Sequence, residues 1–329
     1  MIWNIIVLLV IGLVAGLIAR AVIPGKQDLG ILATIVLGII GSFVGNLLGG
    51  ILSGRGFDTV ADIATIPCRA APHVGSTPAW RFLDGVADAC TADALNGWIA
   101  EDREKPFFAV FWTNDTHWPY FPQGEETDFG VGNEHLNRYL NALRSSDRAI
   151  GRVLERLGSA GLLASTLVAV VGDHGEAFGE RGHWVHGESL YEEEIRIPLI
   201  LVNPLLGAER RSSTLGGLVD VAPTVMDVLQ LPVPGVWQGR SLFADRRPDR
   251  VYFSAAYRDV LAGYREGDRK YILNDTRNRL EVYDLAADPG ERADLQARAP
   301  QATGPVRERV AAWGQYQRAL IAKLSAAPR

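Results

Sequence analysis

Residues Thr166-Leu167-Val168-Ala169-Val170-Val171-Gly172-Asp173-His174-Gly175-Glu176 join a continuous apolar run to a polar, glycine-flanked end. The run is short and rich in β-branched side chains, which is typical of a strand buried on both faces. Polar residues at the end of such a strand lie at the edge of the sheet where open α/β folds bind their ligands. The stretch therefore predicts a buried strand over 166–172 that carries Asp173 and His174 to a functional site.

The segments on either side of this strand predict an α/β fold. Residues 106–113 and 197–202 form two further short apolar runs, and both are predicted to be buried strands. Residues 137–157 carry apolar side chains at helical spacing and end at Gly158. We therefore expect a sheet covered by helices, with the polar residues 114–117 placed at the end of its first strand.

The histidines of this region favour a metal site. Asp173 and His174 offer one hard oxygen and one imidazole nitrogen, a pair that suits a divalent manganese or zinc ion better than magnesium or calcium. His183 and His186 follow in a glycine-rich segment, and His117 follows the run at 106–113. A lone histidine is more often a hydrogen-bonded structural group, and that is our interpretation of His73 and His135.

Several motifs of the chain resemble the sulfatase family of the alkaline phosphatase superfamily. Residues 172–180 and 186–200 carry the strongest resemblance. Five more stretches resemble segments of the family and occur along the chain in the family's order: 116–120, 218–224, 238–242, 269–272 and 281–291. The resemblance covers residues 54–329. It implies a mixed sheet flanked by helices over 54–250, incomplete at its amino-terminal side, and a small antiparallel sheet with a helix over 251–329.

The resemblance also implies roles for individual residues. Asp173 and His174 would be metal ligands, for Mn, Zn, Ca or Mg. His117 would contact the anionic oxygens of the ester or protonate its leaving group. His186, with His183 as the alternative, would stand where many sulfatases place a cation against the sulfate. Glu176 would orient His174 by contacting its ring without binding the metal itself.

The nucleophile of such an enzyme is unknown in this chain. Sulfatases carry it in a Cys/Ser-x-Pro-x-Arg motif, and the sequence contains no match to that motif. Cys68 lies in Ile66-Pro67-Cys68-Arg69, where the proline precedes the cysteine and the arginine follows it directly, and Cys90 fits less well. One disulfide between these two cysteines would be compatible with an oxidising compartment.

Two functions of different classes follow. The first is a membrane-anchored, metal-dependent hydrolase of sulfate or phosphate esters, impaired because the nucleophile motif and the first metal-ligand strand are missing. The second is a catalytically inactive, membrane-anchored binding or interaction protein, and a fused gene fragment is a third explanation. The choice between sulfate, phosphate and phosphonate stays open. A net charge of −5 without a basic block argues against nucleic acid as a partner.

Residues 1–53 are predicted to form a transmembrane helical hairpin. The segments 2–23 and 29–52 are almost free of charge, and each has about the 20 residues that span a bilayer as a helix. Their glycines recur at four-residue spacing, which suits a tight hairpin or a homo-oligomer in membrane lipid. The segment resembles the small transglycosylase-associated, or stress-response, membrane proteins of bacteria.

The charges beside the two segments predict their orientation. Arg20 and Lys26 lie at the turn, whereas Arg55 is the lone basic residue after the second segment. By the positive-inside rule the turn is cytoplasmic. We therefore expect an inner-membrane protein whose soluble part is periplasmic or extracellular.

Overall fold

The computed structural model describes residues 59–61, 65–66, 68, 85–101, 106–207, 209–298, 301 and 303–326. The predicted membrane segments lie outside these residues. Among the helices that the structure does describe, none is both long enough and apolar enough to cross a bilayer. The chain divides into two compact units, Met1–Ala71 and Pro72–Arg329, and the fold below is that of the second.

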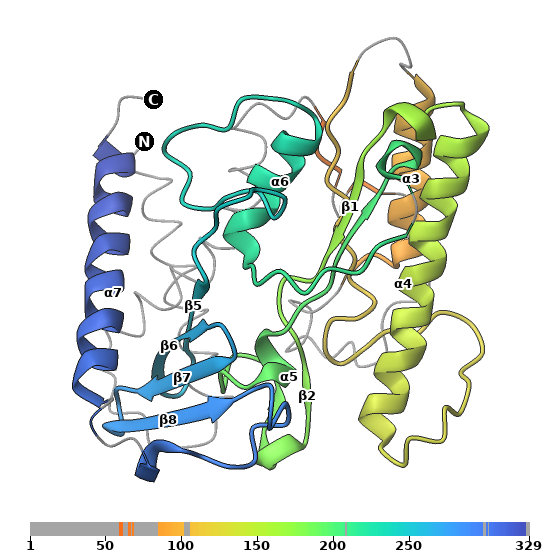
Figure 1. Ribbon diagram of the computed structural model, residues 1–329. Coiled ribbons are helices and arrows are strands. Elements are labelled where there is room, and N and C mark those ends of the chain that lie inside the picture. The colour runs from red at the N-terminus through yellow and green to blue at the C-terminus, as the bar shows by residue number, and fades with distance from the viewer. Residues whose placement is uncertain are drawn as a thin grey trace, which may run out of the picture. The chain divides into compact units, whose positions relative to one another are not determined.

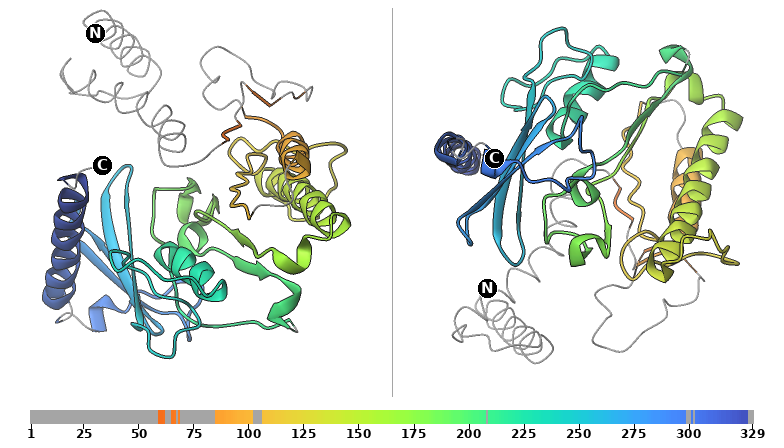
Figure 2. Two further views of the ribbon diagram at one scale, coloured as in Figure 1. Left: turned by 90° about the horizontal axis from the view of Figure 1, so that it is seen from above. Right: turned by 60° about the horizontal axis from the view of Figure 1, so that its bottom comes forward.

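The second unit combines helices and strands along its whole described length (Figures 1 and 2). Its α-helices are α3 (Asp88–Glu101), α4 (Glu134–Ser159), α5 (Glu192–Ile195), α6 (Val221–Val228) and α7 (Thr303–Ala326). Its strands are β1 (Val168–Val171), β2 (Ala177–Phe178), β3 (Trp184–Val185), β4 (Leu199–Val202), β5 (Arg250–Ala256), β6 (Val260–Glu266), β7 (Arg269–Asn274) and β8 (Arg279–Asp284). Short 3-10 helices are η2 (Leu163–Ser165), η3 (Glu180–Gly182), η4 (Pro204–Leu206), η5 (Leu218–Asp220) and η6 (Gln296–Arg298).

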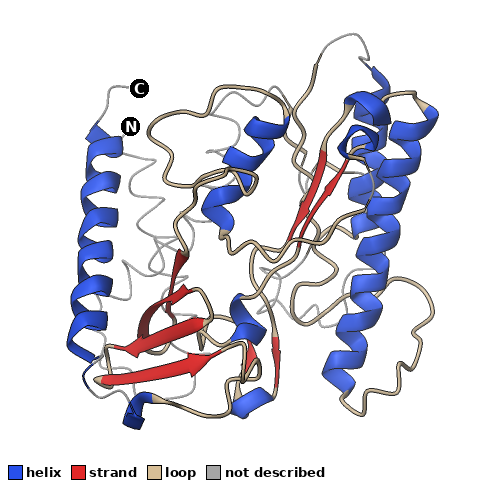
Figure 3. Cartoon of the chain, in the orientation of Figure 1, coloured by secondary structure: helices blue, strands red, loops and turns tan. Residues whose placement is uncertain are grey.

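The strands predicted at 166–172 and 197–202 are confirmed as β1 and β4. They pair antiparallel, with Val168 opposite Val202 and Val171 opposite Leu199. The other described pairs, β2 with β3 and the four strands β5–β8, are antiparallel as well (Figure 3). The expected mixed sheet is therefore not seen in the part of the chain that the structure describes, because no parallel partner lies beside β1 there.

The prediction of a buried strand over 106–113 is wrong for the described residues. The segment belongs to no sheet there, and three of its large side chains are more than half exposed, Phe108 at 71%, Val110 at 56% and Trp112 at 64%. Phe107 and Phe111, which point the other way, pack against the cluster between α3 and α4. One face of the segment is thus covered by helices and the other is open. An uninterrupted apolar run does not distinguish this arrangement from burial on both faces.

Helix α4 confirms the predicted helical periodicity and packs along α3 (Figure 1). The Asn133 side chain caps its first turn by accepting a hydrogen bond from Leu136 N. Its apolar stripe meets the apolar face of α3 in a cluster built on Ala92, Ile99, Ala149, Val153 and Leu157. This pair of helices fixes the segments that lead into the loop at 114–120.

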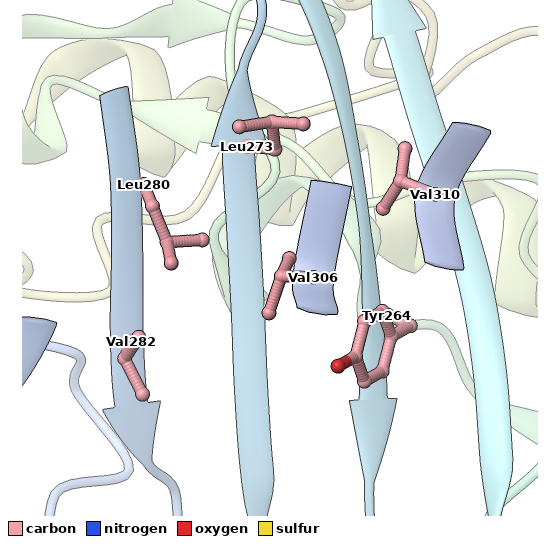
Figure 4. Close-up of a cluster of buried hydrophobic side chains, with 6 residues drawn as sticks. All are labelled: Tyr264, Leu273, Leu280, Val282, Val306 and Val310. Carbon is pink, nitrogen blue, oxygen red and sulfur yellow. The ribbon is translucent and has the colours of Figure 1, made fainter. Parts of the chain in front are cut away.

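The small carboxy-terminal antiparallel sheet is present, in the strand order β5-β6-β7-β8. Helix α7 lies against it and inserts Val306 and Val310 between the strand side chains (Figure 4). Gly263 of β6 is required by close approach, because a Cβ atom there would lie 2.2 Å from Tyr271 O. The buried cluster consists of Tyr264, Leu273, Leu280, Val282, Val306 and Val310.

A buried ion cluster ties this sheet to α5. Lys270 of β7 is fully buried, and its Nζ lies 2.9 Å from Glu192 Oε1 and 2.8 Å from Glu291 Oε1. Glu192 N donates to Glu291 Oε2 at 2.7 Å, and Tyr191 OH donates to Glu281 Oε2 at 2.7 Å. Helix α5 is therefore held at its start by the carboxy-terminal sheet.

Candidate active site

The loop after β1 is anchored before it reaches the polar residues. Gly172 N donates to Pro198 O at 3.2 Å, which extends the pairing of β1 with the segment before β4. Gly175 N donates to Glu194 O at 2.8 Å, and a Cβ atom on Gly175 would lie 2.2 Å from Glu193 O. Only glycine allows this approach to α5. The loop consequently holds Asp173 and His174 at the end of β1, as the sequence predicts.

Three histidines from separate segments meet beside this loop. His174 follows β1 and His186 follows β3, and their ring centroids are 3.8 Å apart. His117, from the loop at 114–120, has its ring centroid 6.3 Å from that of His186. The structure therefore brings together three of the four histidines that the sequence analysis assigned to the site. The fourth, His183, contacts the carboxylate of Glu188 instead, with Nδ1 3.5 Å from Oε2.

Glu176 connects this group to the buried interior. Its Oε2 lies 3.1 Å from His186 Nδ1, and its Oε1 accepts a hydrogen bond from Tyr120 OH at 3.2 Å. The hydrogen bond from Glu176 raises the pKa of His186, although partial burial of the ring opposes the rise. The hydrogen bonds of Glu176 thus orient His186, whereas the expected partner was His174. The raised pKa makes His186 easier to protonate than a free imidazole, and its role beside the sulfate stays a prediction.

The donor atoms fit a divalent metal ion. His174 Nδ1 lies 2.8 Å from Gly175 O, and because a carbonyl can only accept, Nδ1 carries the proton and Nε2 keeps its lone pair. Nε2 lies 3.6 Å from Asp173 Oδ2, close to the separation of two ligands that share an ion with bonds of about 2.1 Å. One ligand atom each of His174, Glu176 and His186 also lie within 4.8 Å of one another, an alternative ligand set in which His186 would bind the ion as a neutral imidazole.

The family of the chain can be assigned from this geometry together with a sequence comparison. The model of the family described as Sulfatase matches residues 42–231, more than half of the 329 residues. The chain belongs to the sulfatase family. The match begins inside the second predicted membrane segment and ends just after α6, so it includes every residue predicted for the site.

Curated sulfatases match about half of this chain. Bovine arylsulfatase K is 27% identical over 190 residues, which are 52% of this chain and 35% of that protein. The N-acetylglucosamine-6-O-sulfatase of Bacteroides thetaiotaomicron is 33% identical over 187 residues, 51% of this chain and 33% of that protein. The chain therefore spans about a third of the length of these curated relatives.

Solved structures support the same fold for this sulfatase. A Bacteroides fragilis protein assigned to the sulfatases aligns with a TM-score of 0.61 and 19% identity, over 70% of this chain and 58% of that one. The crystal structure of Ps i-CgsB in complex with k-i-k-neocarrahexaose aligns with a TM-score of 0.58 and 15% identity, over 70% of this chain and 55% of that one. At these identities the likeness is one of fold.

A buried carboxyl pair beneath the site of this sulfatase was missed by the sequence analysis. Asp88 accepts hydrogen bonds from Asn114 N and Ser146 OH, each at 2.5 Å, whereas Asp115 Oδ2 has no hydrogen-bond partner. Burial, and then the neighbouring charge of Asp88, raise the pKa of Asp115 to about 7. The pair fixes the start of the loop that carries His117. The sequence contains no spacing signal that relates Asp88 to this loop.

Tyr120 was predicted only as part of a motif, and it proves to be a link between segments. Its ring is buried against Tyr139 and Phe178, at centroid distances of 5.5 and 6.0 Å. Its hydroxyl reaches Glu176 as described above. The aromatic residue after the proline of this motif thus holds the His117 loop against the loop that follows β1.

Proposed function

We propose that this chain binds a divalent metal ion through Asp173 and His174 and uses the adjoining histidines to bind and cleave a sulfate ester. The observation that carries the proposal is the convergence of His117, His174 and His186 near Glu176, from the loop at 114–120, the loop after β1 and the end of β3. The membership in the sulfatase family favours sulfate over phosphate or phosphonate. The names of the curated relatives, which act on sulfate esters, support the same choice.

Different side chains would bind the ester and transfer the proton. His186, favoured as a cation by Glu176, would bind the anionic oxygens of the ester. His117 Nδ1 lies 2.7 Å from Trp118 O, so the ring donates to that carbonyl, and Nε2 would have to take up a second proton before it could protonate the leaving oxygen. A bound ion would supply positive charge against the anionic group, which a carboxylate and an imidazole are suited to hold.

The absence of a recognisable nucleophile motif favours slow turnover. Cys68 and Cys90 are both disulfide-bonded, so neither is a free thiolate. The alternative function is to bind the ion and the ester without cleaving the ester. The lack of a match to the nucleophile motif favours this alternative as well. Both functions use the same ligands, so binding and turnover have to be measured separately.

The test uses the purified full-length chain, stripped with a chelator and reloaded with Mn²⁺, Zn²⁺, Ca²⁺ or Mg²⁺. We expect hydrolysis of 4-nitrophenyl sulfate with at least one of these ions. In Asp173→Ala we expect metal affinity to fall by at least tenfold and turnover to be lost, because one of two ligands is removed. Asp245→Ala, an exposed aspartate outside the site, is the matched control. Metal-dependent ester binding without turnover in the wild type would identify the binding function, and hydrolysis that survives in Asp173→Ala would overturn the proposal.

We also propose that residues 1–53 anchor the protein in a bacterial inner membrane as a helical hairpin. The two uncharged segments at 2–23 and 29–52 support this, and the glycine spacing supports close packing or self-association of the hairpin. On fractionation, the full chain should sediment with membranes and resist extraction by sodium carbonate. Substituting Leu9→Arg together with Leu37→Arg should release it into the soluble fraction, because each charge costs about 3 kcal/mol at a bilayer centre. A wild-type chain recovered in the soluble fraction would exclude the anchor.

A further inference from the structure

We propose that an aromatic pocket next to the three histidines is a subsite for one flat aromatic ring, carried by the alcohol part of the ester. This inference deepens the proposed function and rests on it. The pocket has a volume of about 200 Å³ and is lined by Trp118, Tyr120, His135, Trp184 and Val185. Four of these five residues have ring side chains, and no carboxylate, lysine or arginine is among them.

The chain connectivity places the pocket beside the candidate active site. Trp118 directly follows His117, and Val185 directly precedes His186. Tyr120, at the pocket wall, donates its hydroxyl proton to Glu176 on the side of the histidines. A ring in the pocket would therefore lie within one residue of both histidines assigned to the ester. The alcohol part of an ester bound at these histidines could therefore extend into the pocket.

Trp184 is held in place although it is half exposed. Its ring lies edge-on to His135 of α4, with centroids 5.3 Å apart, and its relative exposure is 47%. On its other side the backbone of Gly179 comes so near that a Cβ atom there would lie 3.0 Å from Trp184 Cζ2. Gly179 has φ +107°, a conformation that favours glycine. A large aromatic side chain that is fixed by its neighbours and left open to solvent is arranged to contact a ligand.

Two of the lining residues are among the six described non-glycine residues with a positive φ. Tyr120 has φ +64° and Val185 has φ +65°. For a β-branched residue such as Val185 this region is rarely occupied and is strained. Such strain is found mainly at binding and catalytic sites. Both of these residues line the pocket.

Size and polarity select the ligand. An apolar cavity of about 150 Å³ accommodates benzene, so 200 Å³ is sufficient for one ring and too small for two. A sugar ring needs hydrogen-bond partners for several hydroxyl groups. The Tyr120 hydroxyl is already bonded to Glu176, so the lining side chains offer few polar groups to a sugar, chiefly the ring nitrogens of His135 and Trp184. These surroundings favour an aryl group over a pyranose.

The test measures ring binding without any ester. Ligand-observed NMR titrations of the full-length chain use 4-cresol as the aromatic probe and methyl β-glucoside as the sugar probe. We expect 4-cresol to bind at least ten times more tightly than the glucoside. Trp184→Ala should weaken 4-cresol binding about tenfold through the lost ring contact, and Trp184→Phe should retain most of the binding. Trp237→Ala, which removes a tryptophan of similar exposure, 40%, outside the pocket, should bind like the wild type.

The outcomes separate this inference from the proposed function. If 4-cresol binds as expected and no ester is hydrolysed, the subsite stands and the hydrolase proposal fails. If 4-nitrophenyl sulfate is hydrolysed while Trp184→Ala binds 4-cresol as tightly as Trp237→Ala does, the subsite is overturned. Tighter binding of the glucoside than of 4-cresol overturns it as well. Circular dichroism spectra of both alanine variants check that each variant remains folded.

Discussion

Replacing Lys270 by methionine is expected to lower the free energy of unfolding by about 3–5 kcal/mol, the usual cost of removing one partner of a buried ion pair. Lys270 Nζ lies between Glu192 and Glu291 at 2.9 and 2.8 Å, and the side chains of Lys270 and Glu291 are fully buried. Burial already raises the pKa of Glu291, and the lysine opposes that rise. Without the ammonium group, Glu291 would remain buried as an uncompensated charge or take up a proton.

Thermal unfolding followed by circular dichroism measures this effect. For a folded part of this size the loss corresponds to a fall in Tm of about 10 °C. Lys323→Met, at an exposed position near the end of α7, makes the same chemical change without a buried partner and should leave Tm almost unchanged. Equal Tm values for the two variants would show that the ion cluster does not hold α5 against the sheet.

The stability of the protein is expected to fall as the pH rises from about 4 to about 7 because of Asp115. Its pKa is raised to about 7 from an ordinary value of 3.8, so the folded state keeps a proton that the unfolded state has already lost. The stabilisation from this group is complete below the unfolded pKa and is lost as the pH rises through the folded pKa. A shift of about three units corresponds to on the order of 4 kcal/mol.

Asp115→Asn should remove this pH dependence, because the amide remains neutral throughout. Urea unfolding at pH 4 and pH 8 should show a small difference between variant and wild type at pH 4 and a gain of several kcal/mol for the variant at pH 8. Asp147→Asn, an exposed aspartate on α4, is the matched control. If the Asp115→Asn curve followed the wild-type curve at both pH values, Asp115 would be ionised in the folded protein at neutral pH.

The sequence was sufficient where a single segment carries the signal. β1 and β4 were predicted from short apolar runs and α4 from its periodicity, and Asp173 and His174 follow β1 as expected. The exposed face of residues 106–113 was not predictable, because which side of an apolar run is covered depends on segments elsewhere in the chain.

The contacts inside the candidate site show the same limit. The motif at 116–120 placed His117 in the site but gave no reason to connect Tyr120 with Glu176, 56 positions later in the chain. His135 was interpreted as a structural histidine, and in the fold it packs against Trp184 at the pocket. Such contacts depend on how distant loops pack against each other in the fold, and the local spacing of residues does not predict that packing.

The hydrogen bond from Gly175 to Glu194 has a consequence for motion. It joins the loop that carries Asp173 and His174 to α5, and α5 is joined in turn to β7 by Lys270. Opening the loop must either break this hydrogen bond or move α5 against its contacts with the carboxy-terminal sheet. The amide hydrogen of Gly175, although it lies in a loop, should therefore exchange with solvent more slowly than loop amides that donate to no carbonyl.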